Sequence, residues 1–292
     1  LAGVSDSTRG CFGGGDTGAS TSVIDYITIA TTGNATSFGI LTTTKYNMTG
    51  VSDSTRGVFC GGWATSATNV MEYITIQTTG NATNFGQLTL ARSSLAGASS
   101  ATRGCIAGGS DAGGTYQSVI DYITIATTGN ATNFGNLTIA RDSSGGVSDL
   151  TRGCFGGGYT GAPQSLIDYI TIATTGNATN FGNLTVARSQ LAGVSDSTRG
   201  CFGGGYTNNY TSVIDYITIA TIGNATSFGN LPADKYLSAG VSDSTRGCFG
   251  GGTNATVTFR TIDYITIQTT GNVTYFGDLT GIRFGSAGVS GS

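Results

Sequence analysis

The chain has 292 residues, of which 49 are glycine, 2 are proline and none is histidine. The lack of histidine excludes imidazole metal sites and serine hydrolases that use a histidine base. A net charge of −3 argues against the basic face that a nucleic-acid partner requires. No stretch reaches the 18 or so apolar residues of a membrane helix, so we expect no membrane insertion. We also expect no cofactor and no metal.

Six copies of one unit fill the chain. Thr-Arg-Gly places an arginine at Arg9, Arg56, Arg103, Arg152, Arg199 and Arg246, at spacings of 47, 47, 49, 47 and 47 residues. Asp/Glu-Tyr-Ile-Thr-Ile repeats in register, with its tyrosine at Tyr26, Tyr73, Tyr122, Tyr169, Tyr216 and Tyr264. Gly-Asn-x-Thr-x-Phe-Gly also repeats, with its phenylalanine at Phe38, Phe85, Phe134, Phe181, Phe228 and Phe276. We therefore expect one domain, 1–292, of units near 1–44, 45–91, 92–140, 141–187, 188–234 and 235–285.

Each unit is predicted to form four short strands. In the fourth copy we expect strands over Gly145–Asp149, Thr151–Gly157, Leu166–Ala173 and Ala178–Ala187. Thr-Gly-Asn at Thr175–Asn177 indicates a turn between the last two, with Gly-Asn expected to supply residues of positive φ. Four strands in about 47 residues are typical of a propeller blade. The predicted fold is all-β, a six-bladed β-propeller, with a β-solenoid as the alternative.

The unit resembles the kelch repeat. Cys154-Phe155-Gly156-Gly157-Gly158 is followed by Asp168-Tyr169, then by Phe181 and Arg188. Two features depart from the kelch pattern, because phenylalanine replaces the tryptophan of strand four and Asp-Tyr replaces Tyr-Asp. The nearly identical copies are also similar to kelch-like repeat proteins of phages that infect marine cyanobacteria. This resemblance implies four-stranded kelch-like blades and a tail-fibre or other virion protein.

The charged residues repeat with the unit. A basic residue ends each fourth strand, and an acid precedes each tyrosine of the second marker. The basic residues are Lys45, Arg92, Arg141, Arg188, Lys235 and Arg283, and the acids are Asp25, Glu72, Asp121, Asp168, Asp215 and Asp263. Five more acids fall in the first turn, at Asp6, Asp53, Asp149, Asp196 and Asp243. An active site needs unique groups, so we interpret these charges as structural pairs or turn caps, with six equivalent ligand sites between blades as the alternative.

The 6 cysteines lie about one repeat apart, which fits no metal motif and no disulfide between neighbouring blades. We expect free, buried thiols, as in a protein assembled inside a cell.

Variation between the copies is concentrated in two connections. One is the loop between strands two and three, and the other is the junction between blades, so an up-and-down blade places both on one face. Aromatic residues gather in them, and we name as candidate ligand-binding residues Trp63, Tyr116, Tyr159, Tyr206, Tyr210, Tyr46, Tyr236, Phe259 and Phe284. Aromatic rings on loops rich in Ser, Thr, Asn and Gly suit stacking on sugars and adaptable protein recognition, although they could also simply cover the core.

The expected function is that of a non-enzymatic recognition module of a virion or extracellular surface. Its expected partner is a host-surface glycan or protein, or other virion proteins, and it could form a homo-oligomer. The alternative is a purely structural assembly or decoration subunit without a ligand. An enzyme is disfavoured. A copper enzyme of the kelch type would need histidines, which the chain lacks, and a sialidase would need unique arginines and a Tyr/Glu pair, which are not visible in the sequence.

The two ends of the chain carry copies of the same strand. Leu1–Asp6 and Ser286–Gly291 both match the first strand of the repeat, so seven first strands are available for six blades. A tight turn joins Leu1–Asp6 to the next strand, so we expect this copy to occupy the innermost position. Ser286–Ser292 is then expected to lie outside as a tether or contact segment. Because Leu1 is not an initiator methionine, we expect the chain to be a processed product or part of a longer protein.

Overall fold

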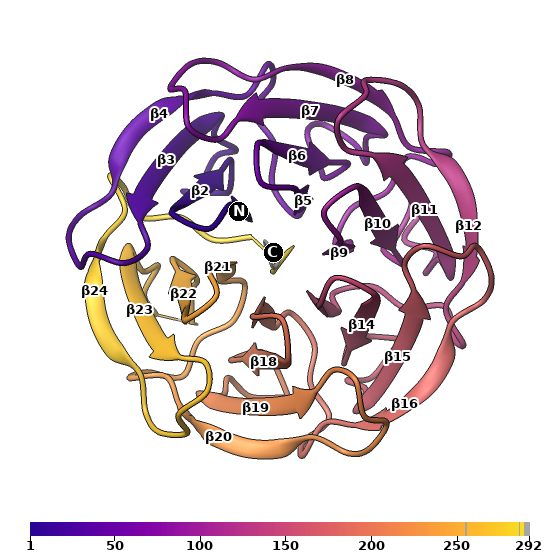
Figure 1. The fold of residues 1–292 in the computed structure, drawn as a ribbon. Helices are drawn as coiled ribbons and strands as arrows, with labels where there is room; N and C mark the ends of the chain where they lie inside the picture. The colour runs from indigo at the N-terminus through magenta and orange to yellow at the C-terminus, as the bar shows by residue number, and fades with distance from the viewer. Residues whose placement is uncertain (255, 286, 289–292) are drawn as a thin grey trace.

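A computed structural model describes residues 1–254, 256–285 and 287–288. It shows six four-stranded antiparallel sheets arranged as a ring around a central axis (Figure 1). The prediction of an all-β, six-bladed propeller is therefore confirmed, and the solenoid alternative was wrong. Among the described residues there is no helix with the length and apolar character needed to cross a membrane.

Every blade has the strand order of the sequence, with its first strand innermost. The first blade contains β1 (Ala2–Ser5), β2 (Arg9–Gly13), β3 (Val23–Thr28) and β4 (Thr36–Ile40). The second contains β5 (Thr49–Ser52), β6 (Arg56–Cys60), β7 (Val70–Thr75) and β8 (Thr83–Gln87). The third contains β9 (Ala96–Ser99), β10 (Arg103–Ala107), β11 (Val119–Thr124) and β12 (Thr132–Asn136).

The remaining blades repeat this arrangement. The fourth contains β13 (Gly145–Ser148), β14 (Arg152–Gly156), β15 (Leu166–Thr171) and β16 (Thr179–Asn183). The fifth contains β17 (Ala192–Ser195), β18 (Arg199–Gly203), β19 (Val213–Thr218) and β20 (Thr226–Asn230). The sixth contains β21 (Ala239–Ser242), β22 (Arg246–Gly250), β23 (Thr261–Thr266) and β24 (Thr274–Asp278), and β25 (Ala287–Gly288) adds to its inner edge.

The fourth strand is shorter than predicted. β16 ends at Asn183 and not at Ala187, because the chain beyond it leaves its own sheet and crosses to the next blade. There, Thr185 donates its N–H and hydroxyl hydrogen bonds to Asp215, over 3.1 and 2.5 Å. Sequence patterning alone extends the strand because Leu184 and Val186 continue the apolar alternation.

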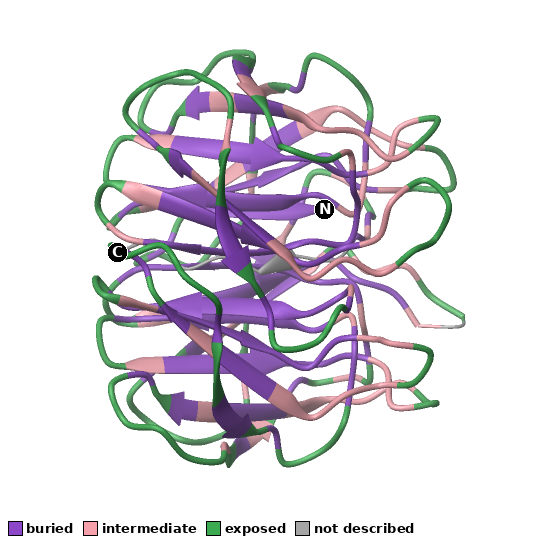
Figure 2. Ribbon diagram, turned by 90° about the vertical axis from the view of Figure 1, so that its right-hand side faces the viewer, coloured by how far each residue is buried: buried purple, intermediate pink, exposed green. Residues whose placement is uncertain are grey.

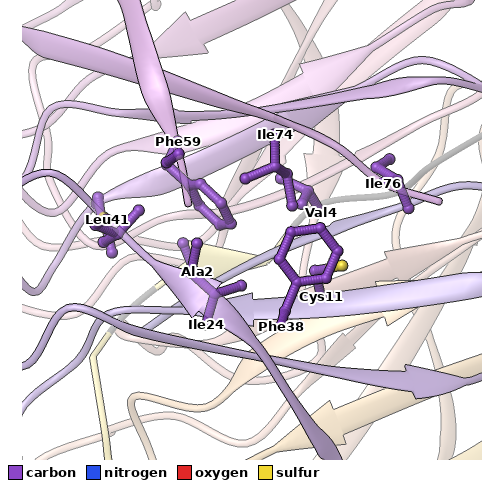
Figure 3. Close-up of a cluster of buried hydrophobic side chains, with 11 residues drawn as sticks. Ala2, Val4, Cys11, Ile24, Phe38, Leu41, Phe59, Ile74 and Ile76 are labelled. Carbon is purple, nitrogen blue, oxygen red and sulfur yellow. The ribbon is translucent and has the colours of Figure 1, made fainter. Parts of the chain in front are cut away.

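The hydrophobic core lies between neighbouring blades. Figure 3 shows one such cluster, in which Ile24 and Phe38 of the first blade face Phe59 and Ile74 of the second. Most strand residues are buried, whereas the loops at both ends of the ring are mainly exposed or half-buried (Figure 2). Phe59 is 0% exposed, so its truncation to alanine should cost about 3–5 kcal/mol.

The central axis requires residues without a side chain. A Cβ at Gly146 of β13 would lie 1.8 Å from the carbonyl oxygen of Gly97 in β9. The same conflict repeats around the axis, because each first strand has a glycine at this level. The Ala/Gly-Gly-Val pattern of the first strands is therefore explained by close packing of six backbones.

The turn between the third and fourth strands differs from the prediction. It spans more residues than a tight hairpin, and neither Gly176 nor Asn177 has a positive φ. Instead, the loop crosses the outer strand of the preceding blade: Gly176 donates its N–H to Phe134 O over 2.9 Å, and Asn177 Oδ1 accepts the N–H of Asn136 over 3.0 Å. Such contacts cover the exposed edge of each sheet.

The first and last blades are joined by the same kind of loop contact and by one further contact at the junction. Gly33 donates its N–H to Phe276 O over 2.9 Å, and Asp16 donates its N–H to Phe284 O over 2.8 Å. β1 pairs with β2 in the innermost position, as predicted.

The C-terminal copy does not behave as an external tether where it is described. Ala287 and Gly288 pair in parallel with Ala239 and Gly240 of β21, which places β25 at the centre of the ring (Figure 1). This corrects the expectation for the two residues of β25, which lie against the innermost strands of the blades and not outside the ring. Residue 286 and residues 289–292 lie outside the described residues.

Candidate functional site

The repeated charges join neighbouring blades. Each basic residue after strand four forms a buried ion pair with the acid of the next blade, as Arg141 does with Asp168 over 2.9 Å. The same arrangement joins Lys45 to Glu72, Arg92 to Asp121, Arg188 to Asp215, Lys235 to Asp263 and Arg283 to Asp25. Burial lowers the pKa of Arg141, and the carboxylate of Asp168 acts in the opposite direction. The interpretation as structural pairs is confirmed.

The Thr-Arg-Gly arginines also connect blades. Arg152 stacks 4.5 Å above the ring of Tyr169 in its own blade and donates to Ile219 O of the next blade over 2.9 Å. The acid of the preceding turn accepts local N–H groups, since Asp149 Oδ1 lies 2.7 Å from the nitrogen of Thr151 and 2.6 Å from that of Arg152. These contacts stabilise the scaffold, and the charged groups of Arg152 and Asp149 are occupied by partners within the protein.

All six cysteines are buried and free. Burial raises the pKa of the Cys60 thiol to about 12 and that of the Cys105 thiol to about 12 as well. Such thiols are poor nucleophiles at neutral pH, so they pack as small apolar side chains, as predicted.

The two variable connections meet on one face of the ring. In each blade, the junction forms an isolated bridge with the loop between strands two and three, for example Tyr46 with Trp63 and Asp142 with Tyr159. Ser189 pairs in the same way with Tyr206. We call this surface the junction face, defined by the six bridges Asp16–Phe284, Tyr46–Trp63, Ser93–Ser110, Asp142–Tyr159, Ser189–Tyr206 and Tyr236–Thr253.

All nine candidate residues lie in these connections, and all nine are half-buried. Tyr116 and Tyr159 approach edge to face, with ring centroids 6.0 Å apart. Tyr210 stacks on Tyr236 at 5.0 Å, and Tyr206 lies 5.9 Å from Tyr210.

The remaining candidates are more dispersed. Trp63 bridges to Tyr46 and Ala67, Phe284 bridges to Asp16, and the ring of Phe259 lies 5.7 Å from Lys235 Nζ. The structure thus brings together two groups of tyrosines but does not unite all nine residues in one site.

A hollow of about 350 Å³ opens between the third, fourth and fifth blades on this face. Tyr116, Tyr159 and Tyr206 line it together with polar residues of three successive junctions, which are Ser94, Asp142, Ser143, Ser189 and Gln190. The junction residues are held by a chain of backbone hydrogen bonds around the axis. Ser143 donates its N–H to Ser94 O over 2.8 Å, and Gln190 donates to Ser143 O over 2.7 Å.

Sequence reasoning missed the polar members of this hollow. Ser94, Ser143 and Gln190 adopt positive φ values of 56°, 57° and 58°. Non-glycine residues rarely occupy this region, and no local pattern indicates it here. The one sequence signal was Asp142, an acid at a junction position where the other copies have Tyr, Ser or Phe.

Asp142 is the charged group of the hollow. Burial raises the pKa of its carboxyl, while hydrogen bonds with Ser143 and Ser110 lower it. Partial burial raises the pKa of Tyr116, and the neighbouring Asp142 adds to that increase. The hollow therefore combines aromatic rings, hydroxyl and amide groups and one carboxylate, which together can stack on a ring and accept hydrogen bonds.

The described residues contain no cluster of three or more His, Cys, Asp or Glu side chains able to hold a metal ion. A scan against protein-family models found no match for the chain, and a search of curated proteins found none either.

Proposed function

We propose that this protein is a non-enzymatic recognition module whose junction face binds a host-surface glycan or protein. The observation that carries the proposal is the hollow of about 350 Å³, which three tyrosines line at the place where the repeats differ most. Half-buried tyrosine is rigid and amphipathic, so it binds sugar faces and protein surfaces at a small entropic cost. The scaffold holds these rings in place while the loops vary.

The setting we propose is a virion or extracellular surface, as a tail-fibre or appendage protein. A six-bladed ring of four-stranded blades is compatible with a kelch-like repeat, and the resemblance of the repeats to kelch-like phage proteins supports the setting. The absence of an enzymatic role is part of this proposal. It is supported by the use of the repeated arginines, lysines and acids in ion pairs and caps between blades, which leaves them engaged in structure.

One observation favours the alternative of a structural assembly or decoration subunit. Tyr206, Tyr210 and Tyr236 contact one another, with centroids 5.0–6.3 Å apart. Rings that pack together cover apolar surface without needing a ligand. The stacked pair Tyr210 and Tyr236 therefore fits a cap over the ends of the blades, whereas Tyr116, Tyr159 and Tyr206 border the hollow.

Binding to a glycan array and to host cells tests the proposal. Trp63→Ala, Tyr159→Ala and Tyr206→Ala should each weaken binding, the last two by at least about fivefold, as for a central contact residue. Tyr275→Ala is the matched control, because Tyr275 is 56% exposed and belongs to β24, away from the junction face.

If Trp63→Ala, Tyr159→Ala and Tyr206→Ala all bind as strongly as the wild type and the Tyr275→Ala control, recognition through this face is contradicted. Turnover of any glycoside by the wild-type protein would contradict the non-enzymatic assignment. Loss of assembly into a larger particle, with no binding to host material, would favour the structural alternative.

A further inference from the structure

Asp142 differs from the other acids of the junction face in the partners of its carboxylate. Asp16 Oδ1 accepts the N–H of Gly18 over 2.6 Å, and Asp111 Oδ1 accepts that of Thr115 over 3.0 Å, so both acids fix their own loops. Among the described residues, Asp142 accepts no backbone N–H with its carboxylate, and no lysine or arginine forms an ion pair with it. Its charge is therefore not used to hold a turn or a blade interface.

The local pairing places this carboxylate beside two aromatic rings. Asp142 and Tyr159 form an antiparallel bridge, in which Tyr159 donates its N–H to Asp142 O over 2.8 Å. Residues opposite each other in an antiparallel pair project their side chains to the same side, with Cβ atoms about 4.5–5.5 Å apart. Ser110, which hydrogen-bonds to the carboxyl of Asp142, is bridged in the same way to Tyr116. The carboxylate therefore lies beside the rings of Tyr116 and Tyr159, whose centroids are 6.0 Å apart.

The hollow contains no positive charge to offset this carboxylate. Among the described residues that line its volume of about 350 Å³, Asp142 alone is charged at neutral pH. The adjacent Arg141 is 0% exposed and pairs with Asp168 over 2.9 Å, so its guanidinium is directed to the blade interface. A carboxylate has about four acceptor positions, of which Ser143 and Ser110 occupy two. Asp142 thus keeps acceptor positions for a ligand.

The carboxylate and the rings together favour a ligand that carries an ammonium group. An ammonium can donate to a carboxylate and can also lie over the face of an aromatic ring, whereas a ligand carboxylate or phosphate would be repelled. Ser94, Ser189 and Gln190 add hydroxyl and amide groups to the same lining. The hydroxyls of a sugar ring can pair with these groups, but the hydrocarbon stem of a lysine ligand would leave them without partners.

We propose that the hollow of the junction face binds an amino sugar with a free, protonated amine, and that Asp142 sets this preference by accepting a hydrogen bond from the ammonium group. This inference rests on the proposed function and specifies the chemical class of its glycan. One such site per chain is expected, because only one junction carries the acid. The equivalent residues of the other junctions are Tyr46, Ser93, Ser189, Tyr236 and Phe284.

Titrations with four methyl glycosides, followed by calorimetry or proton NMR, test the charge preference. The ligands are the glucosaminide, the N-acetylglucosaminide, the glucoside and the glucuronide. At about pH 7 an amine with a pKa near that of an α-amino group, about 8, is mostly protonated. The wild-type protein should bind one glucosaminide per chain, about tenfold more tightly than either neutral sugar, since a charged hydrogen bond exceeds a neutral one. It should bind the glucuronide most weakly.

Asp142→Asn removes the charge and keeps the size of the side chain. The preference for the glucosaminide over the N-acetylglucosaminide should then fall below about threefold, while the glucoside binds as before. The ratio of the two affinities is decisive, because a fraction of misfolded protein lowers both apparent affinities by the same factor. Asp234→Asn is the matched control and should keep the wild-type preference. Asp234 is an exposed acid outside both the hollow and the six bridges of the junction face.

The outcomes separate this inference from the proposed function. Equal binding of the glucosaminide and the neutral sugars, weakened by Tyr159→Ala, would overturn the inference and support the proposed function. An unchanged preference in Asp142→Asn would overturn the role of this carboxylate. Tighter binding of Nα-acetyl-lysine methylamide than of the glucosaminide would assign the ammonium group to a protein ligand and overturn the choice of a sugar.

A complete lack of glycoside binding by the wild type would also overturn the inference. The proposed function would then stand only if the protein still binds host cells and loses that binding in Tyr159→Ala. Absence of both kinds of binding would overturn the two proposals together.

Discussion

The buried ion pairs between blades provide the sharpest test of how the ring is held together. Arg141→Met removes the guanidinium from Asp168 but keeps a side chain of similar length. Asp168 is 0% exposed and would retain only the N–H and hydroxyl of Thr138, at 3.1 and 2.7 Å. Removing one partner of a buried pair costs about 3–5 kcal/mol, because a charge stays buried without its counter-charge.

This loss converts to a measurable shift in melting temperature. With an unfolding entropy of about 2.1 cal/mol/K per residue, the chain of 292 residues has a total near 0.6 kcal/mol/K. A loss of 3–5 kcal/mol then lowers the melting temperature by about 5–8 °C, which scanning calorimetry resolves easily.

Arg260→Met is the matched control. Arg260 also pairs with a carboxylate, since its Nε lies 3.1 Å from Asp278 Oδ2, but its side chain is 60% exposed. Exposed pairs contribute about 0–1 kcal/mol, so the melting temperature should fall by less than about 2 °C. An Arg141→Met protein as stable as Arg260→Met would refute the argument that these pairs hold neighbouring blades together.

Three further predictions concern the axis, the thiols and the C-terminal strand. Gly146→Ala should destabilise the protein by about 1–3 kcal/mol or more in denaturant unfolding, because its Cβ would meet Gly97 O, whereas Gly176→Ala, with nothing within 4 Å, should change stability by less than about 1 kcal/mol. The pKa of the Cys60 thiol is raised from 9.0 to about 12, so between pH 9 and 12 only the unfolded thiol ionises and the free energy of unfolding should fall, with no such loss below pH 8. A Cys60→Ala variant should show a smaller fall, and rapid labelling of the native thiols at pH 8 would contradict their burial. Deleting residues 286–292 should lower the melting temperature by only a few degrees, because the described strand β25 contributes two residues to the sheet and the ring closes through Gly33 and Asp16; a loss of many degrees would show that this segment holds the ring closed.

The sequence predicts the blade pattern well because its signals are local. Alternation in Leu166–Thr171 and the glycines after β14 are visible within a single repeat, and six copies reinforce the same assignment. The structural role of the repeated charges also follows from repetition alone. Which charges pair does not, since Arg141 lies in the junction after β12 of the third blade, Asp168 lies in β15 of the fourth, and the two are 27 residues apart.

The errors arose where contacts between blades override local preference. Gly-Asn at Gly176 and Asn177 favours a tight turn, but its backbone and side chain bind the preceding blade instead. The hollow on the junction face shows the same limit. Tyr159 and Tyr206 could be named from composition, whereas the contribution of Gln190 depends on a backbone conformation set by three successive junctions.

Hydrogen–deuterium exchange in the presence of host-surface polysaccharide or outer-membrane protein tests the central claim most directly, because it reports which face is covered. We expect the strongest protection in peptides that contain Tyr159 and Tyr206 and the junctions at Asp142 and Gln190, which border the same hollow. Protection should vanish on a Tyr159→Ala, Tyr206→Ala double variant. Binding without any protection of these peptides would contradict recognition through the junction face.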